Sequence, residues 1–233
     1  MTSRYAIYYA PDAASDLWRF GTGWLGRDPL SGVALPHPAL DDLDADFIAT
    51  ATESPRHYGF HATLKAPFAL AEGTYAAHLV HALGDFASHQ TPFPAPPLEL
   101  TRLGDFLALT LSEPDERMAA LAEACTRQFD RFRAPPSEAE LEKRRAAGLS
   151  ARQEELLAKW GYPYVMEAFR FHLSLTGRLS PADLDRTETA LRQVVAPLCV
   201  APLPVGSVCL YWQKDRTTPF TLIRRFAFGQ GGD

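Results

Sequence analysis

The chain contains Phe-His-Ala-Thr-Leu at residues 60–64 and Phe-His-Leu-Ser-Leu at residues 171–175. Both copies follow one pattern: phenylalanine, histidine, any residue, a hydroxyl residue and leucine. Each copy lies in a segment rich in aromatic and aliphatic residues, Tyr58 to Leu70 and Tyr164 to Gly177, which is typical of strands. The repeat therefore predicts two similar strands at equivalent positions of the fold.

The spacing within each copy predicts which side chains share a face. Residues two apart in a strand point to the same side of a sheet. His61 and Thr63 should therefore lie on one face, and His172 and Ser174 should do the same on the second strand. The intervening residues are apolar and suit a core, so each strand offers one imidazole and one hydroxyl on its other face.

Two imidazoles with two hydroxyls suit the hydrolysis of a phosphodiester. One histidine can take a proton from water while the other, protonated, gives a proton to the leaving oxygen. We therefore predict His61 and His172 as catalytic residues, and Thr63 and Ser174 as hydrogen-bond donors to the phosphate. The alternative is that each histidine is structural, but the repetition favours the catalytic interpretation. This chemistry requires neither a metal ion nor a cofactor, and we expect none.

Four further residues are candidates for substrate binding. Lys65 follows the threonine of the first copy by two residues, and Arg170 precedes the second histidine by two, so both should share the catalytic face. Either could bind phosphate; the alternatives are a solvated lysine and a structural ion pair. Tyr58 and Tyr8 could line a cleft between the two histidine strands and stack on a base or sugar of the substrate. The alternative is that both belong to the core.

The remainder of the chain predicts an α+β fold. Short strands and helices alternate, and neither a Gly-x-Gly-x-x-Gly nor a phosphate-loop motif occurs. We expect a helix over 13–25 and a long surface connection over 26–56. The polar stretch 134–160 predicts an inserted helical hairpin, broken at Gly148, and we hypothesise that it is a lid over the cleft. The alternative is a hairpin without a role in the chemistry.

Charge and composition limit the classes of partner that we expect for this chain. The chain has 233 residues and a formal net charge of −5, so it lacks the basic excess of proteins that bind long nucleic acids. A small phosphate ester is the expected substrate.

No apolar run approaches a membrane span, and the N-terminal residues lack the layout of a signal peptide. Three cysteines without metal-ligand spacing favour a reducing cytoplasm. Nothing in the sequence indicates an oligomeric state.

The two histidine strands resemble those of the two-histidine (2H) phosphoesterase superfamily, which includes RNA 2′–5′ ligase-like proteins and cyclic phosphodiesterases. Tyr58-Gly-Phe-His-Ala-Thr-Leu-Lys-Ala-Pro-Phe68 and Phe169-Arg-Phe-His-Leu-Ser-Leu-Thr-Gly177 are most similar to one uncharacterised branch, DUF1045-like, often encoded beside phosphonate-utilisation genes. The resemblance extends to the opening segment 4–10 and the closing segment 210–214. It implies a single bilobal domain over 1–233, with two pseudo-symmetric lobes of small antiparallel or mixed sheets around a central cleft. The strand of His61 would lie in one lobe and that of His172 in the other.

The resemblance also implies cleavage of a cyclic or nucleotide-linked phosphodiester by the four motif residues. Our hypothesis is a metal-independent hydrolase of a small cyclic phosphodiester, such as a sugar cyclic phosphate from phosphonate breakdown. An RNA-end 2′,3′-cyclic phosphate or a 2′–5′ phosphodiester is the competing substrate. A protein that binds a phosphate ligand without turnover is the alternative from another class, although binding alone does not require two acid–base groups.

Overall fold

The computed structural model describes residues 3–40, 42–146 and 148–229, which form an α+β fold with antiparallel strand pairing in each sheet. The predicted fold class, α+β with small sheets, is confirmed. A four-stranded sheet has the order β2-β1-β8-β9, a three-stranded sheet the order β4-β5-β6, and β3 pairs with β7. The strands are β1 (Arg4–Tyr9), β2 (Ala62–Phe68), β3 (Phe93–Ala95), β4 (Leu98–Leu103), β5 (Phe106–Leu111), β6 (His172–Ser174), β7 (Leu203–Val205), β8 (Ser207–Gln213) and β9 (Thr221–Ala227).

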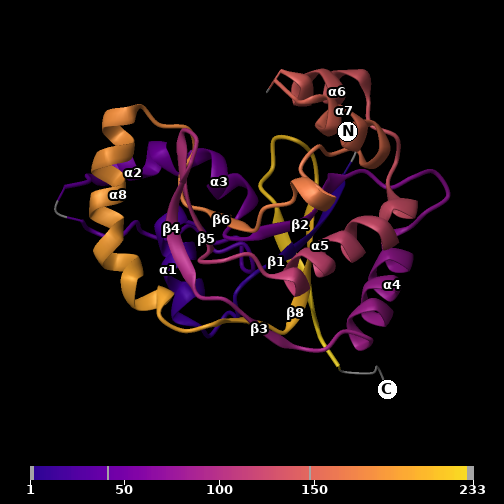
Figure 1. Ribbon diagram of the computed structural model, residues 1–233, viewed down its shortest axis with the longest axis horizontal. Coiled ribbons are helices and arrows are strands. Elements are labelled where there is room, and N and C mark those ends of the chain that lie inside the picture. Colours follow the sequence, from indigo (N-terminus) through magenta and orange to yellow (C-terminus); the bar gives the residue numbers. More distant parts are fainter. Residues whose placement is uncertain (1–2, 41, 147, 230–233) are drawn as a thin grey trace.

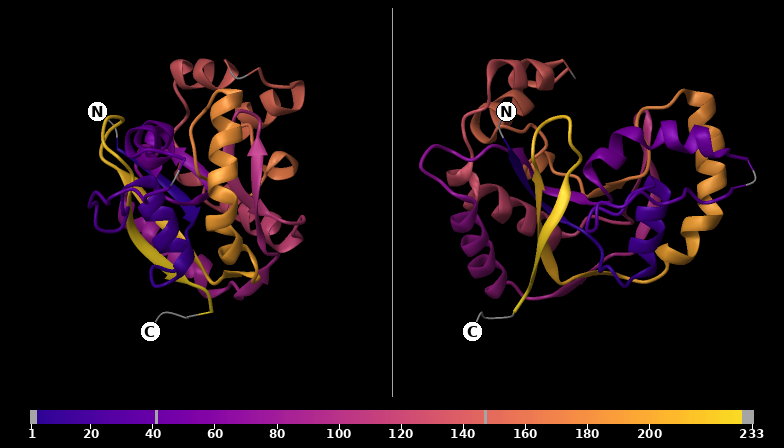
Figure 2. Two further views of the ribbon diagram at one scale, coloured as in Figure 1. Left: turned by 90° about the vertical axis from the view of Figure 1, so that its left-hand side faces the viewer. Right: turned by 180° about the vertical axis from the view of Figure 1, so that it is seen from behind.

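The helices divide between the two larger sheets. Helix α8 packs on the three-stranded sheet, whereas α4 and α5 pack on the four-stranded sheet. Figures 1 and 2 show these groups at opposite ends of the molecule, with β2 and β6 between them. None of the helices in the described ranges is both long and apolar enough to span a membrane. The helices are α1 (Asp16–Leu25), α2 (Ala45–Ala51), α3 (Glu53–Tyr58), α4 (Ala76–Ser88), α5 (Glu116–Gln128), α6 (Glu138–Arg145), α7 (Ala151–Trp160) and α8 (Pro181–Val195).

Strand β1 lies inside the four-stranded sheet and is buried on both faces. Ile7 and Tyr9 belong to the main hydrophobic core, while Ala6 and Tyr8 belong to a second, smaller cluster on the other side. An interior strand covered on both faces needs apolar residues at successive positions. This is why the segment is a nearly continuous aromatic and aliphatic run, and it places a tyrosine beside the edge strand β2.

The segment before the first histidine differs from the prediction. The expected surface connection 26–56 contains α2 and most of α3, and the expected strand from Tyr58 begins only at Ala62. The Asp44 side chain caps α2 by accepting a hydrogen bond from the Phe47 amide. Helix α3 then ends at Gly59, whose φ of 83° lies in the region that favours glycine. The first histidine therefore follows a helix end rather than a strand interior.

The second motif strand is also shorter than expected. Of the predicted strand 164–177, only His172–Ser174 pairs within a sheet, on the edge beside β5. A short 3-10 helix, Met166–Ala168, precedes it. The residues predicted to form an inserted helical hairpin contain α6 and α7, each begun by a serine capping box.

Helix α1 contacts both motif segments. Gly21 packs against Phe60, and the Trp24 indole donates a hydrogen bond of 2.7 Å to the Leu175 carbonyl. A Cβ atom added at Gly21 would lie 2.1 Å from the Phe60 ring, whereas one added at Gly23 would meet no atom within 4 Å. Only a glycine at position 21 allows α1 to lie this close to the first histidine segment.

We expect Gly21→Ala to lower the free energy of unfolding by about 1–3 kcal/mol, because the methyl group must displace the buried Phe60 ring. Denaturant titration measures this change. Gly23→Ala is the matched control in the same helix, and there the gain in helix propensity should raise stability by up to about 1 kcal/mol. Equal effects of the two variants would contradict the close packing of Gly21 on Phe60.

Candidate active site

His61 lies immediately before β2 with its ring held by the backbone. The His61 Nδ1 atom is 2.8 Å from the Gly59 carbonyl oxygen. A carbonyl oxygen only accepts hydrogen bonds, so Nδ1 carries the proton and Nε2 keeps a free lone pair. The Thr63 hydroxyl lies 3.3 Å from that Nε2 atom and can donate to it. The free nitrogen and the hydroxyl are thus adjacent, as the residue spacing predicts.

His172, the first residue of β6, repeats this arrangement. Its Nδ1 atom lies 2.9 Å from the Arg170 carbonyl oxygen, again two residues earlier in the chain. The same tautomer follows, with Nε2 available for proton transfer. Ser174 lies two residues further along the same strand. Both motifs therefore present a histidine whose ring orientation is set by a backbone carbonyl.

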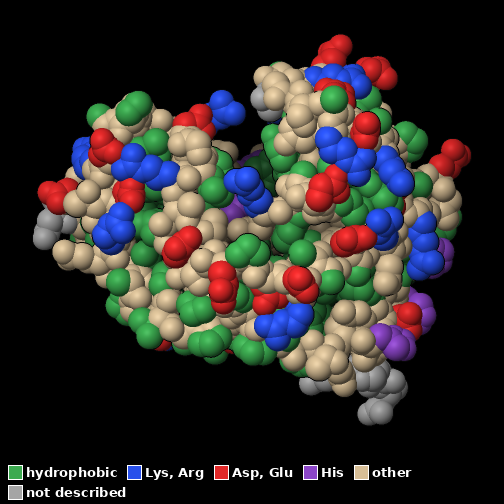
Figure 3. Space-filling view, viewed as in Figure 1, with side chains coloured by type: hydrophobic (Ala, Val, Ile, Leu, Met, Phe, Trp, Pro, Cys, Tyr) green, Lys and Arg blue, Asp and Glu red, His purple; other side chains and the backbone are tan. Residues whose placement is uncertain are grey.

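One cavity of about 160 Å³ brings the four motif residues together. It lies where the edge strand of the four-stranded sheet meets the edge strand of the three-stranded sheet. Figure 3 shows the molecule hollowed in this region, with histidine side chains visible inside the hollow. The lining residues are Arg4, Tyr8, Tyr58, His61, Thr63, Ala66, Pro67, Arg144, Tyr162, His172 and Ser174.

The surroundings of the cavity favour neutral imidazoles. Burial lowers the pKa of His61 to about 4; the Gly59 carbonyl partly opposes this shift, and the nearby His172 adds to it. Burial also lowers the pKa of His172, against the effect of the Arg170 carbonyl. A bound phosphate anion favours the protonated form of a neighbouring histidine and would raise both pKa values. An anion bound beside these imidazoles would thus favour their protonated form.

Both tyrosines predicted near the site line the cavity. The Tyr8 ring stacks on the His61 imidazole, with centroids 3.7 Å apart and an interplanar angle of 25°. Tyr58 ends α3 and stacks on the buried Phe220 ring at 5.4 Å. Tyr8 is almost completely buried, so it also belongs to the core. It restricts the imidazole plane from one side, while the Gly59 carbonyl restricts rotation of the ring.

The prediction that Lys65 shares the catalytic face is wrong. Tyr8 of β1 pairs with Thr63, but the preceding Ile7 pairs with Lys65, so β2 contains one extra residue, Leu64. Such a β-bulge interrupts the alternation of side chains. Lys65 is buried, and its Nζ atom lies 3.2 Å from both the Thr126 carbonyl oxygen and an Asp130 carboxylate oxygen.

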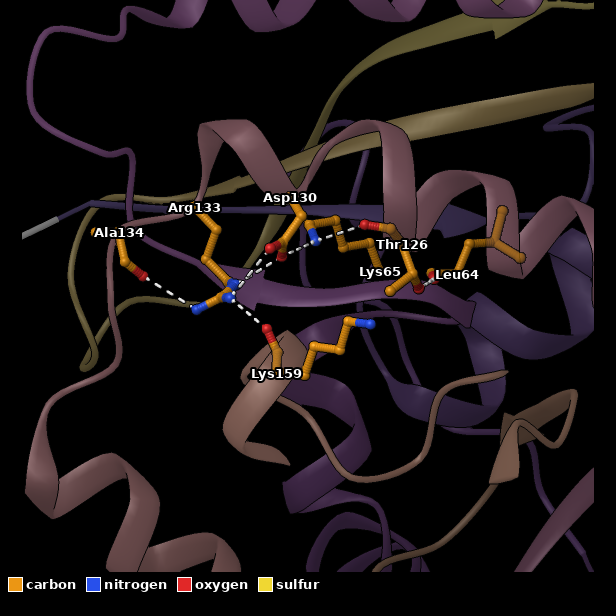
Figure 4. Close-up of polar contacts among 7 residues, drawn as sticks. All are labelled: Leu64, Lys65, Thr126, Asp130, Arg133, Ala134 and Lys159. Carbon is orange, nitrogen blue, oxygen red and sulfur yellow. Dashed lines mark hydrogen bonds and ion pairs between the residues drawn. The ribbon is translucent and has the colours of Figure 1, made fainter. Parts of the chain in front are cut away.

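Figure 4 shows this buried polar group on the side of β2 covered by α5. Asp130 also accepts a hydrogen bond of 2.8 Å from Arg133, so two cations share one carboxylate. The two cations hold the pKa of Asp130 below its usual value, against the effect of burial. Lys65 therefore serves the packing of the sheet against α5 rather than the cavity.

Arg170 also lies elsewhere than predicted. Its side chain is exposed and borders a neighbouring depression with Thr101 and Thr110, not the cavity of the histidines. The reason is that Arg170 precedes the short strand β6, where the alternation of a strand does not yet apply. Its contribution to the site is the carbonyl group that orients His172.

Three cavity residues with charged or aromatic side chains were not anticipated from the sequence. Arg4 begins β1, Arg144 belongs to α6, and Tyr162 follows α7. The lid hypothesis for 134–160 pointed to the region of Arg144 but not to the residue. No spacing rule links these positions to the histidines, because they approach the cavity only through tertiary contacts.

Comparison with known proteins identifies a matching family model and similar curated proteins. Residues 63–221 match the model described as "Protein of unknown function (DUF1045)". The chain is 38% identical over 234 residues to "Ribose 1,5-bisphosphate phosphokinase PhnN" of Janthinobacterium sp. (strain Marseille), covering 98% of this chain and 52% of that protein. It is 42% identical over 224 residues to the protein of the same name from Laribacter hongkongensis (strain HLHK9), covering 95% and 51%. The chain thus spans about half the length of the curated relatives it matches.

Two solved structures are similar over nearly the whole chain, at low identity. One is E. coli LigT complexed with 3′-AMP, with 14% identity, a TM-score of 0.48, and coverage of 99% of this chain and 100% of that chain. The other is described as a phosphoesterase, with 13% identity, a TM-score of 0.42, and coverage of 99% and 100%.

We expect His61 and His172 to titrate below the ordinary histidine pKa of about 6.5, with His61 near pH 4. Saturating inorganic phosphate should raise both pKa values, because the bound anion stabilises the imidazolium form. NMR titration of the histidine ring protons measures this, with His61→Gln and His172→Gln to assign the signals. Unchanged pKa values in a phosphate-saturated protein would contradict an anion site at the imidazoles.

We expect Lys65→Met to lower the free energy of unfolding by about 1–3 kcal/mol, because Asp130 loses the buried one of its two cationic partners. Affinity for inorganic phosphate should stay at the wild-type level, since Lys65 does not line the cavity. Denaturant titration and calorimetry provide the two measurements. A selective loss of phosphate affinity with stability unchanged would restore Lys65 as a ligand residue.

Proposed function

The chain belongs to the DUF1045 family, and from this premise we propose that it is a metal-independent phosphodiesterase that hydrolyses a small cyclic phosphodiester with two histidines. The observation that carries the proposal is the pair of backbone-oriented imidazoles, His61 and His172, in one cavity with two hydroxyl side chains. Such a pair can supply a base and an acid from two separate segments of the chain. Membership of the 2H phosphoesterase superfamily is part of the same proposal.

The proposed reaction uses both imidazoles in one displacement. Nε2 of the neutral histidine removes a proton from water as the water oxygen bonds to phosphorus. The bond from phosphorus to one ring oxygen breaks, and Nε2 of the protonated histidine gives that oxygen its proton. The hydroxyls of Thr63 and Ser174 donate hydrogen bonds to the non-bridging oxygens, whose negative charge must be stabilised in the transition state. The product is a phosphomonoester with a free hydroxyl.

We propose a sugar cyclic phosphate as the substrate, with a role in phosphonate metabolism. The relatives' name refers to ribose 1,5-bisphosphate, and opening a cyclic phosphate on ribose gives a ribose phosphomonoester of that compound class. The kinase activity in that name belongs to proteins about twice as long, and the 233 residues contain no Gly-x-x-x-x-Gly-Lys-Ser/Thr phosphate loop. We therefore extend only the compound class to this chain. A cavity of about 160 Å³ suits a small ester.

We expect wild-type protein to hydrolyse at least one cyclic member of a panel of phosphodiesters in the presence of a metal chelator. The panel contains the 1,2- and 2,3-cyclic phosphates of ribose, a nucleoside 2′,3′-cyclic phosphate and a 2′–5′ dinucleotide. His61→Ala and His172→Ala should each lower turnover about 10²–10⁴-fold, because each removes an acid–base group. Release of the phosphomonoester, followed by phosphorus NMR, measures the reaction.

His78→Ala is the matched control, since His78 is an exposed histidine on α4 and should leave turnover unchanged. Inhibition by the chelator would exclude the metal-independent mechanism. Tight binding of panel members without hydrolysis would instead support a phosphate-binding protein. Turnover restricted to the nucleoside or dinucleotide substrates would support RNA-end processing.

A further inference from the structure

We propose that Arg4 and Arg144 form a second anion subsite, so that the substrate carries a phosphomonoester in addition to its cyclic phosphate. This inference rests on the proposed function for the identity of the first phosphate. The subsite takes no part in proton transfer. In this proposal, the two arginines determine substrate specificity.

A larger cavity of about 280 Å³ adjoins the cavity of the histidines. The two cavities share Arg4, Tyr58, Pro67 and Arg144 in their walls. A ligand whose cyclic phosphate lies between the histidines can therefore extend past the two arginines. Among the described residues, the lining of the histidine cavity contains no aspartate or glutamate, and the lining of the larger cavity contains one, Glu140, which pairs with Arg216.

Arg4 is oriented by a neutral partner. Its Nε donates a hydrogen bond of 2.8 Å to Oε1 of Gln213, and its Nη2 donates to the same oxygen. Gln213 is fully buried, and its Nε2 is 2.8 Å from His57 Nε2 and donates to the Thr218 carbonyl oxygen at 2.7 Å. The amide thus fixes the guanidinium without cancelling its charge. Burial and the nearby Arg216 lower the pKa of Arg4, so an anion would be favourable beside it.

Arg144 reaches the cavity from α6, and its guanidinium lies 4.8 Å from the centroid of the Tyr162 ring. Within residues 3–40, 42–146 and 148–229, no carboxylate lies within ion-pair distance of Arg144. Three neighbouring cations do have such partners. The pairs are Arg216 with Glu140, Arg133 with Asp130, and Arg145 with Glu154.

The charge balance favours a second phosphate. A cyclic phosphodiester carries one negative charge, and the histidines and hydroxyls already provide groups for it. A phosphomonoester carries about −1.5 to −2 charges at pH 7, which two uncompensated guanidinium groups match. Arginine also offers paired N–H donors to phosphate oxygens. Because Arg144 belongs to α6, binding of that phosphate would hold the α6–α7 hairpin against the cavity.

The test compares ribose 1,2- and 2,3-cyclic phosphates with and without a 5-phosphate. The measured quantity is the selectivity ratio, which is kcat/KM for the 5-phosphorylated compound divided by kcat/KM for its unphosphorylated partner. We expect the wild-type ratio to be about 10 or more, and Arg144→Gln to lower it about tenfold through KM. Arg4→Gln should also lower it, since it removes the second guanidinium group of the subsite.

Arg145→Gln is the control on the same helix, because Arg145 pairs with Glu154 and does not line either cavity; its ratio should remain that of wild type. A second arm measures by calorimetry the affinity for ribose 1,5-bisphosphate relative to ribose 1-phosphate. Hydrolysis with equal rates for both members of each pair, unchanged in Arg144→Gln, would overturn the subsite while leaving the proposed function intact. If no cyclic phosphate is hydrolysed, the proposed function is wrong. The relative affinity for ribose 1,5-bisphosphate and ribose 1-phosphate, measured by calorimetry, then still tests the subsite.

Discussion

Helix α1 provides the contact on which the arrangement of the site depends. It lies against Phe60, the residue before the first histidine, through a glycine, and it binds the Leu175 carbonyl, directly after the second motif strand, through a tryptophan indole. Both Phe60 and Leu175 are fully buried. Because one helix holds both segments, the two histidines keep a constant relation although the strands beside them, β2 and β6, belong to different sheets. A side chain at position 21 would clash with the Phe60 ring.

Edge strands explain why the site can form between the sheets. β2 and β6 each lie at the edge of their sheet and contact each other, so the side chains of both strands reach the same cavity. Each histidine ring is then oriented locally, by a carbonyl two residues earlier. Local backbone geometry therefore sets the tautomer of each histidine. The packing of the two sheets places both imidazole rings in one cavity. The Tyr8 ring, supplied by the buried strand β1, covers one face of His61.

The cations around the cavity fall into two groups. Some form ion pairs within the protein, whereas others are available to a ligand. The bulge in β2 turns Lys65 away to a partly buried carboxylate shared with Arg133, and Arg216 pairs with Glu140 in the lining of the larger cavity. Arg4 instead has a neutral glutamine partner. The uncompensated charge is thereby concentrated beside histidines whose pKa values are lowered by burial. An anionic ligand would supply both the missing counter-charge and the electrostatic field that favours a protonated histidine.

The sequence by itself determined which residues of each motif lie together, because the spacing of side chains along an extended segment is a local property: it placed His61 with Thr63 and His172 with Ser174. It also indicated the α+β class and the helical hairpin near Gly148. It could not reveal the bulge at Leu64, since a bulge depends on pairing with β1, and so it misplaced Lys65. The short length of β6 likewise depends on its partner strand, which is why Arg170 was misassigned. Only the tertiary structure brought Arg4, Arg144 and Tyr162 to the cavity, because these residues approach it through contacts between segments far apart in the chain.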